Sequence, residues 1–276
     1  MDKSSSIPIP TPKDQVVILH QHVVPSTECG FDSAQSVVRL VRDKVSHVEF
    51  ILKLFLMKDN AAFEKELSTL TLVKERNLHK AGFPYIISNK KGINHCEILM
   101  EKLGLDLQSK MNEQKSQRFS ARTVFLLMVQ LVERIQELHK LNLIHNDIKL
   151  ENFLIGDKDP GTVYLIDFGL VQPYMEEGKH IKKVQTKRFT GNFLFASINS
   201  CRGFNKSRRD DMESLMYLAV YMLCGNRLPW SNFCKNQSNS IKDPLYWQQL
   251  LNQRNSSHCL AKFFNMCPPQ MLSIVK

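Results

Sequence analysis

Residues 145–152 read His-Asn-Asp-Ile-Lys-Leu-Glu-Asn, and residues 167–169 read Asp-Phe-Gly. The intervening residues 162–166 are Thr-Val-Tyr-Leu-Ile, a β-branched and aliphatic run typical of a strand. An isolated Asp-Phe-Gly recurs by chance, but the preceding His-x-Asp-x-Lys-x-x-Asn makes the combination specific. Two polar loops joined through a strand predict a site for phosphoryl transfer.

Each polar residue type in these loops suits one part of that chemistry. Asp147 is the candidate catalytic base, which would accept the proton of an attacking hydroxyl group. Lys149 lies two residues further on, where it can neutralise charge on the transferred phosphoryl group. Asn152 and Asp167 carry oxygen atoms of the kind that Mg²⁺ prefers, so both are candidate metal ligands.

A lysine upstream of these loops is a candidate for holding nucleotide phosphates. Lys53 lies within a strand-like run, from which it could reach the α- and β-phosphates. Its expected partner is a glutamate of the helix predicted at residues 61–74, where Glu66 precedes the inward-facing apolar positions. Glu64 remains an alternative partner, and Lys58 is a poorer choice than Lys53 because it follows the strand.

The first part of the chain is mainly strand-like, interrupted by that one helix. Short β-branched or aliphatic runs occur at residues 16–19, 37–41, 48–54 and 97–100. The helix shows apolar residues at helical spacing. They are Phe63, Leu67, Leu70 and Val73.

After Gly104 the periodicity becomes helical. Ser120 is the predicted cap of a long helix through Leu138, with a broad face expected to be buried. The apolar positions of this face are Phe125, Leu126, Val129, Leu131, Val132, Ile135 and Leu138. Asp210 or Asp211 is expected to open another apolar helix that reaches Leu223. A small sheet with one helix, followed by a larger helical section, predicts an α+β bilobal fold with its junction near residues 101–106.

Composition narrows the protein class. The 276 residues are 43% hydrophobic and 23% charged, which is ordinary for a soluble globular protein with a sizeable core. No apolar run approaches the ~20 residues of a membrane-spanning helix. Seven cysteines without a Cys-x-x-Cys pair, and no signal peptide, favour free thiols in the cytoplasm or also the nucleus. Residues 1–14 are rich in Ser and Pro, so we expect a disordered tail before one domain at residues 15–276.

Further motifs give the chain a specific resemblance from about residue 15 to its C-terminus. The decisive segments are Thr-Gly-Asn-Phe-Leu-Phe-Ala-Ser-Ile-Asn at 190–199, Ser-Arg-Arg-Asp-Asp-Met-Glu-Ser-Leu at 207–215 and Leu-Pro-Trp at 228–230. Supporting matches are Met-Glu-Lys-Leu-Gly at 100–104 and Asn-Phe-Leu at 152–154. With these segments the chain resembles a eukaryotic protein kinase, and within that superfamily the casein kinase 1 family. Ser-Ile-Asn stands where most kinases carry Ala-Pro-Glu.

The resemblance implies a serine/threonine protein kinase that uses ATP and Mg²⁺, with an N-lobe at about 15–100, a hinge at 101–106 and a C-lobe at 107–276. It implies nucleotide contacts from both lobes. These would be made by Gly30, Val37, Ile51, Lys53, Glu66, Met100, Glu101, Leu103, Leu154 and Ile166. Glu101 and Leu103 would offer backbone groups to adenine beside the gatekeeper Met100, with Val37 and Ile51 above the ring and Leu154 beneath it.

The same resemblance assigns supporting roles. His145 and Phe168 would stack with Leu70 in an apolar spine. Asp211 would anchor the loop of Asp147 from the helix below.

The chain departs from the family pattern at the nucleotide-gripping loop. Of the three expected glycines only Gly30 is present, with Asp32 and Gln35 at the other two positions. Asp32 places a carboxylate near the triphosphate, and Ile51 replaces a common alanine, so weaker ATP binding is expected. The alternative function is therefore a pseudokinase or scaffold with weak or no ATP turnover. Asn146 replaces an arginine that grips a phosphorylated activation loop, so activation by phosphorylation there is not expected.

Charge bears on the partners. The net charge of +10 and the basic residues at 180–183 and 187–188 predict protein substrates that are acidic or already phosphorylated, although Val184 stands at the usual arginine position. No nucleic-acid-binding motif accompanies the charge, so no specific nucleic acid is expected. We expect a monomer. The sequence stops at Lys276, one or two helices short of a complete family C-lobe.

Overall fold

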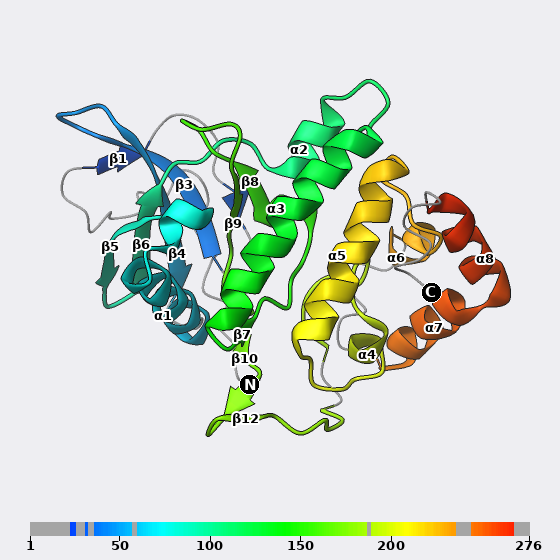
Figure 1. The fold of residues 1–276 in the computed structure, drawn as a ribbon. Coiled ribbons are helices and arrows are strands. Elements are labelled where there is room, and N and C mark those ends of the chain that lie inside the picture. Colours follow the sequence, from blue (N-terminus) through cyan, green and yellow to red (C-terminus); the bar gives the residue numbers. More distant parts are fainter. Residues whose placement is uncertain are drawn as a thin grey trace, which may run out of the picture. The chain divides into compact units, whose positions relative to one another are not determined.

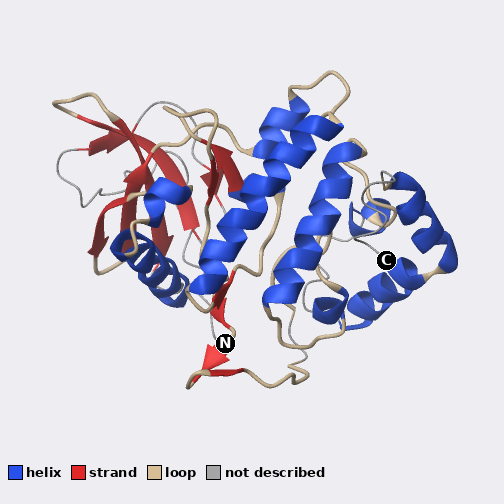
Figure 2. Cartoon of the chain, in the orientation of Figure 1, coloured by secondary structure: helices blue, strands red, loops and turns tan. Residues whose placement is uncertain are grey.

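A computed structural model describes most of the chain as two compact units. The described residues are 23–25, 31–32, 36–56, 60–186, 189–235 and 244–267. The strand unit comprises Met1–Asn60 and Ile87–Lys102, and the helical unit comprises Ala61–Ile86 and Leu103–Lys276 (Figure 1). Figure 2 shows that strands dominate the first unit and helices the second.

The strand unit is built on one sheet. Its described strands are β1 (Val23–Pro25), β2 (Phe31–Asp32), β3 (Ser36–Asp43), β4 (Glu49–Leu56), β5 (Ile86–Lys91) and β6 (His95–Glu101). The order is β1-β3-β4-β6-β5, with β2 paired to β3. β3, β4 and β6 confirm three of the predicted strands, and β5 is an additional one. The predicted strand at 16–19 lies outside the described residues.

The register of β3 against β4 separates two residues that were expected to act together. Val37 lies opposite Leu54, and Val38 lies opposite Lys53. Since alternate residues of a strand point to opposite faces, Val37 shares the face of Leu54 rather than that of Lys53 and Ile51. Val37 packs there against the apolar cluster of this unit. The prediction that Val37 and Ile51 cover the same ring is therefore wrong for Val37.

The helical unit contains most of the helices. They are α1 (Asn60–Glu75), η2 (Leu78–Ala81), α2 (Leu107–Asn112), α3 (Ala121–Lys140), η3 (Leu150–Asn152), α4 (Ile198–Cys201), α5 (Arg208–Leu223), α6 (Ser231–Lys235), α7 (Pro244–Asn255) and α8 (Ser257–Met266). Its short strands are β7 (Leu143–Ile144), β8 (Phe153–Ile155), β9 (Val163–Leu165), β10 (Gln172–Pro173), β11 (Met175–Glu176) and β12 (Lys179–His180). α3 and α5 lie side by side (Figure 1). Among the described residues no helix is long and apolar enough to cross a membrane.

α3 begins as predicted but buries a narrower face than expected. The Ser120 side chain accepts a hydrogen bond from the Thr123 backbone at 3.1 Å, which confirms the predicted cap. Leu131, Ile135 and Leu138 are fully buried. The prediction of burial is wrong for three residues near the start of the helix, which are exposed: Phe125, Leu126 and Val129. Only the second half of α3 supplies a continuous buried stripe.

α5 begins before the predicted aspartates. The Asp210 carboxylate accepts a hydrogen bond from the Ser207 backbone at 2.7 Å, so Asp210 caps the helix from its first turn. The helix therefore starts at Arg208. Both Asp210 and Asp211 are buried at this end, and the apolar residues that follow form the core against α3.

Candidate active site

The carboxylate of Asp147 receives two hydrogen bonds from its own loop. Lys149 Nζ lies 2.7 Å from Asp147 Oδ2. Asn152 Nδ2 lies 3.2 Å from the same oxygen and 2.7 Å from the backbone oxygen of Asp147. Asp147 and Asn152 are buried. The short 3₁₀ helix η3 returns the chain, so that Asn152 faces the aspartate five residues earlier.

A β-hairpin places the two predicted metal ligands, Asn152 and Asp167, at the same end of its paired strands. β8 follows Asn152, β9 precedes Asp167, and the two strands pair antiparallel with Phe153 opposite Leu165. The pairing continues where Ile166 N donates to Asn152 O at 3.0 Å. Residues distant in sequence thus become neighbours because they flank paired strands.

The donor set at this position fits Mg²⁺. Because the amide nitrogen of Asn152 donates to Asp147, the amide oxygen is the atom that can serve a cation. Asp167 adds a carboxylate, with its backbone in the left-handed region at φ 65°. Mg²⁺ usually keeps waters and binds one or two protein oxygens together with substrate phosphates. The described residues accordingly need no larger cluster, and they contain no group of three His, Cys, Asp or Glu side chains arranged for a metal.

Lys149 is held in its charged form. Burial lowers the pKa of Lys149, but the charge and hydrogen bond of Asp147 and the charge of Asp167 raise it, and the net shift is upward. The lysine therefore stays cationic beside both predicted catalytic carboxylates at neutral pH. A permanent cation there can stabilise negative charge developing on a phosphoryl group.

The catalytic loop, residues 145–152, is anchored from α5. Asp211 accepts hydrogen bonds from the backbone nitrogens of His145 at 2.8 Å and Asn146 at 3.0 Å. His139 Nε2 lies 2.9 Å from the same carboxylate. Burial by itself raises the pKa of Asp211. These hydrogen bonds and the charge of His145 lower that pKa by more, so the net shift is downward and the carboxylate is ionised. The anchoring role implied for Asp211 is confirmed.

His145 and Phe168 join the two loops behind the site. His145 Nε2 lies 3.0 Å from Ile166 O, and the His145 and Phe168 ring centroids are 6.0 Å apart. Phe83 stacks on Phe168 at 6.2 Å. Leu70 is fully buried, as expected for a core position. The contribution of Phe83 has no local sequence signal, since it depends on a turn after η2.

The segment from Asp167 to Asn199, named here the activation segment, is fastened by residues of the motifs at 190–199 and 207–215, and by Arg254, which sequence reasoning did not single out. Ser197 Oγ donates to Asp210 at 2.6 Å, and Ile198 N donates to Glu213 at 2.8 Å. Arg254 of α7 donates to the Ala196 carbonyl at 2.6 Å. The Arg254 guanidinium also lies close to the rings of Tyr217 and Trp230, and 3.9 Å from Glu213. The sequence carries no local signal for this role of Arg254, because its burial and its partners arise only from the tertiary structure.

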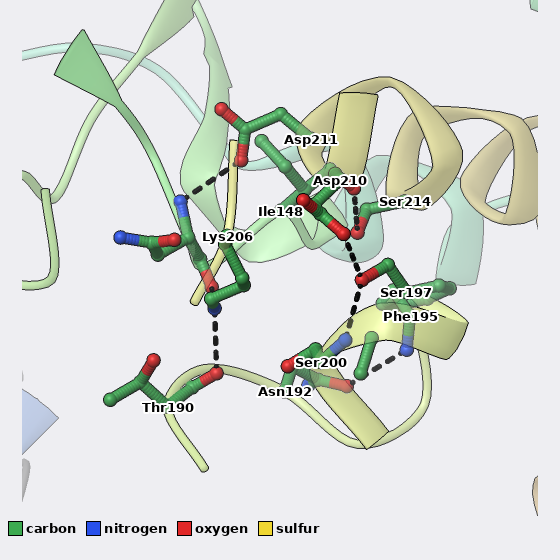
Figure 3. Close-up of a pocket in the computed structure, with 12 residues that line it drawn as sticks. Ile148, Thr190, Asn192, Phe195, Ser197, Ser200, Lys206, Asp210, Asp211 and Ser214 are labelled. Atoms are coloured by element: carbon green, nitrogen blue, oxygen red, sulfur yellow. Dashed lines mark hydrogen bonds between the residues drawn. The ribbon is translucent and has the colours of Figure 1, made fainter. Parts of the chain in front are cut away.

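A small polar pocket lies beneath this segment (Figure 3). Its volume of about 10 Å³ is room for about one water molecule. Lys206 points its ammonium group into the pocket and donates to the Thr190 carbonyl at 2.9 Å (Figure 3). The carboxylates of Asp210 and Asp211 line another side. The pocket is therefore part of the support for the activation segment.

The strand unit presents several predicted nucleotide-binding residues on one face. Lys53 and Ile51 are alternate residues of β4, and Met100 of β6 lies opposite Ile51. These three side chains therefore point to the same side of the sheet. Lys53 is buried, with its amine 5.4 Å from the centroid of the Phe55 ring.

The remaining nucleotide predictions fall on both units. Glu66 is buried whereas Glu64 is exposed, which favours Glu66, but it belongs to the other unit and its pairing with Lys53 stays a prediction. Leu154 lies on β8, and Ile166 follows β9. Glu101 ends β6, with Leu103 two residues on in the helical unit. Lys58 and residues 187–188 lie outside the described residues, as does Gly30.

Two comparisons with known proteins bear on this site, one on its family and one on its fold. The family model of the protein kinase domain matches residues 34–273. A solved structure titled "Structure of vaccinia related kinase 3" is similar with a TM-score of 0.67 and 21% sequence identity, over 95% of this chain and 77% of that chain. At this identity the likeness concerns the fold alone. It agrees with the predicted α+β bilobal fold of a β-rich and a mainly helical part.

Proposed function

Because the chain belongs to the protein kinase family, we propose that it is a serine/threonine kinase of the casein kinase 1 type that uses Mg·ATP. The observation that carries this proposal is the geometry of Asp147, whose carboxylate is 2.7 Å from Lys149 and is also bound by Asn152. Lys149 within Asp-x-Lys-x-x-Asn supports the serine/threonine class. The Ser-Ile-Asn segment at residues 197–199 supports the casein kinase 1 type.

The catalytic residues of the helical unit would have separate roles in the reaction. Asp147 would take the proton of the substrate hydroxyl group, and Lys149 would stabilise charge on the transferred phosphoryl group. Asn152 Oδ1 and the Asp167 carboxylate would hold the cation. When bound, Mg·ATP supplies the phosphoryl group and neutralises part of its charge. Asp211 keeps the loop in place through the two backbone nitrogens that it binds.

Basic side chains within the activation segment support a preference for acidic or phosphorylated protein substrates. Lys182 and Lys183 are exposed, and the Lys183 amine lies 4.4 Å from the Phe204 ring centroid. Asn205 donates to the Lys182 carbonyl at 2.9 Å, which fixes the backbone of this loop. An ordered basic loop attracts acidic substrates chiefly by raising their encounter rate.

The experiment measures transfer of radiolabel from ATP to casein with wild type and Asp147→Asn. We expect the substitution to lower incorporation by roughly 10²- to 10⁴-fold, which is the usual contribution of a general base. Asp157→Asn is the control, because it removes an exposed carboxylate of the same unit without touching the catalytic loop. Phosphoamino-acid analysis of the product should give phosphoserine or phosphothreonine.

A second measurement separates an enzyme from a pseudokinase. Mg·ATP should raise the melting temperature of both wild type and Asp147→Asn, since Asp147 is not a nucleotide ligand in this mechanism. No Asp147-dependent transfer and no such rise would eliminate the kinase proposal. Binding without transfer would leave the scaffold function, and phosphotyrosine as the main product would overturn the residue class.

A further inference from the structure

Asn146 connects both ends of the activation segment to the catalytic loop. Its side-chain amide donates to the Leu170 carbonyl at 2.8 Å, near the beginning of the segment. Its backbone carbonyl accepts from Lys206 Nζ at 3.2 Å, and that amine also donates to the Thr190 carbonyl at 2.9 Å, near the other end. The φ angle of Asn146 is 70°, a left-handed conformation that asparagine adopts more readily than most residues. One loop residue thus meets both ends of the segment.

Lys206 joins Asn146 of the catalytic loop to Thr190 of the activation segment. Its surroundings are unusual for an ammonium group. The residue is partly exposed as a whole, but its amine lies in the pocket beneath the activation segment (Figure 3). Both hydrogen-bond acceptors are neutral carbonyls, and among the described ion pairs none joins Lys206 to a carboxylate. Asp210, Asp211 and Asp147 act on it only through space.

The activation segment approaches the catalytic loop closely at Gly191. Gly191 has a φ of 95°, and a side chain built there would lie 2.1 Å from Asn146 O and 3.6 Å from Lys206 Nζ. The activation segment therefore passes against the catalytic loop with no side chain between them. Two carbonyl oxygens that converge here carry like partial charges, which the cation between them offsets.

We propose that Lys206 is a positioning residue for the kinase reaction, in which its protonated amine ties Thr190 of the activation segment to Asn146 of the catalytic loop. This inference rests on the proposed kinase function, because it assigns a support to the same site. The amine is next to Asn146, the direct neighbour of Asp147. Loss of the charge would release the segment and shift the loop that carries the catalytic base, which lowers the rate of transfer more than it weakens nucleotide binding.

Protonation makes this tie depend on pH. Burial lowers the pKa of Lys206 to about 8, although Asp211, Asp147 and Asp210 raise it in part. The thiol of Cys201 is the other titratable group acting on the amine, and burial raises the pKa of that thiol, so it is neutral when Lys206 titrates. The tie is charge-assisted at pH values below about 8 and weakens as the pH rises through that value, because the neutral amine keeps two donors but loses its charge. Activity should fall on that alkaline side.

The test compares kcat between pH 6.5 and 9.5 for wild type and Lys206→Met, which keeps a long side chain but removes the charge. We expect a reduction of at least about tenfold in kcat at pH 7 with the KM for ATP changed less than about twofold. The alkaline fall of wild type should be absent from the variant. Lys158→Met, which changes an exposed lysine of the same unit, should retain the wild-type profile.

A readout without catalysis keeps this inference separate from the proposed function. Amide hydrogen exchange at pH 7 should accelerate in Lys206→Met within residues 145–147 and 189–195 and stay unchanged elsewhere, whether or not the protein transfers phosphate. Wild-type exchange in those residues would overturn the inference, as would a wild-type kcat and pH profile. A general acceleration over the whole chain would also overturn it, since it would assign Lys206 to global stability.

Discussion

Two buried cations support the activation segment, and they differ in how firmly each keeps its proton. Lys206 binds the Thr190 carbonyl, and Arg254 binds the Ala196 carbonyl. Burial lowers the pKa of Lys206 to about 8. Burial also lowers the pKa of the Arg254 guanidinium, but Tyr217, Cys201 and Glu213 raise it more, so its net shift is upward.

The surroundings explain the difference. Arg254 lies 4.6 Å from the Tyr217 ring centroid and 4.4 Å from that of Trp230, with Glu213 at 3.9 Å. Aromatic faces and a carboxylate stabilise a planar cation that is charged at any physiological pH. Among the described residues, the hydrogen bonds of the Lys206 amine go to carbonyl oxygens. Arg254 therefore keeps its charge at any physiological pH, whereas Lys206 loses its charge as the pH rises through about 8.

Arg254→Met should have the largest effect on stability, because it removes the permanent support. We expect the free energy of unfolding to fall by roughly 3 kcal/mol, since the change leaves Glu213 and the Ala196 carbonyl without their buried cation. Urea denaturation measures it. Arg122→Met, at an exposed position of α3, should stay within about 0.5 kcal/mol of wild type. Equal effects of the two substitutions would show that Arg254 contributes no more than a surface charge.

Gly191→Ala should have the second largest effect on stability, at a position close to the Lys206 amine. Alanine at a positive φ costs about 1 kcal/mol by itself, and here its Cβ also meets Asn146 O at 2.1 Å. Gly225→Ala is the matched control, because Gly225 has a φ of 68° but its nearest neighbour would be 3.5 Å away. We expect Gly191→Ala to destabilise the protein by at least about 1 kcal/mol more than the control in thermal unfolding. Indistinguishable melting temperatures would mean that the segment does not press against the loop.

Lys206→Met should have the smallest effect on stability at neutral pH. Its effect should appear instead in the pH dependence of the free energy of unfolding. The folded-state pKa of about 8 lies below the unfolded value of 10.5, so the unfolded chain binds more protons between these values. Wild-type stability should therefore gain up to about 1 kcal/mol per pH unit between pH 8 and 10.5, relative to the variant. Urea denaturation at several pH values measures this difference.

The direction of the pH dependence of stability distinguishes it from that of activity. Stability should rise over the pH range in which Lys206-dependent activity falls, because deprotonation relieves the burial of charge while it weakens the tie. A difference between wild type and variant that is flat, or that slopes the other way, would contradict the lowered pKa of Lys206.

Local signals predicted the elements well where sequence neighbours decide the outcome. Ser120 caps α3 because the hydrogen bond to Thr123 spans only three residues. The β8–β9 hairpin brings Asn152 and Asp167 together because these residues flank two strands that are adjacent in sequence and pair directly. The apolar period of α3 predicted one broad buried face, yet Phe125 is exposed, since periodicity shows that a helix has an apolar side but not how much of it a neighbour covers.

Strand register was also beyond local inference. Val37 and Val38 are both plausible core residues by type, and a shift of one residue exchanges the faces they occupy. The pairing of Val38 with Lys53 decides that Val37 belongs to the apolar cluster.

The sequence by itself determined the chemistry, because Asp147, Lys149 and Asn152 lie in one loop whose spacing is local, and Asp167 follows across a single hairpin. The resemblance already implied that Asp211 anchors this loop, and the structure confirms it. Only the tertiary structure decided the other two supports. Lys206 and Arg254 are far from the loop along the chain, and they reach it or the activation segment from the turn before α5 and from α7. Their roles depend on burial and on distances to carbonyl and carboxylate oxygens, which arise only when the helices pack.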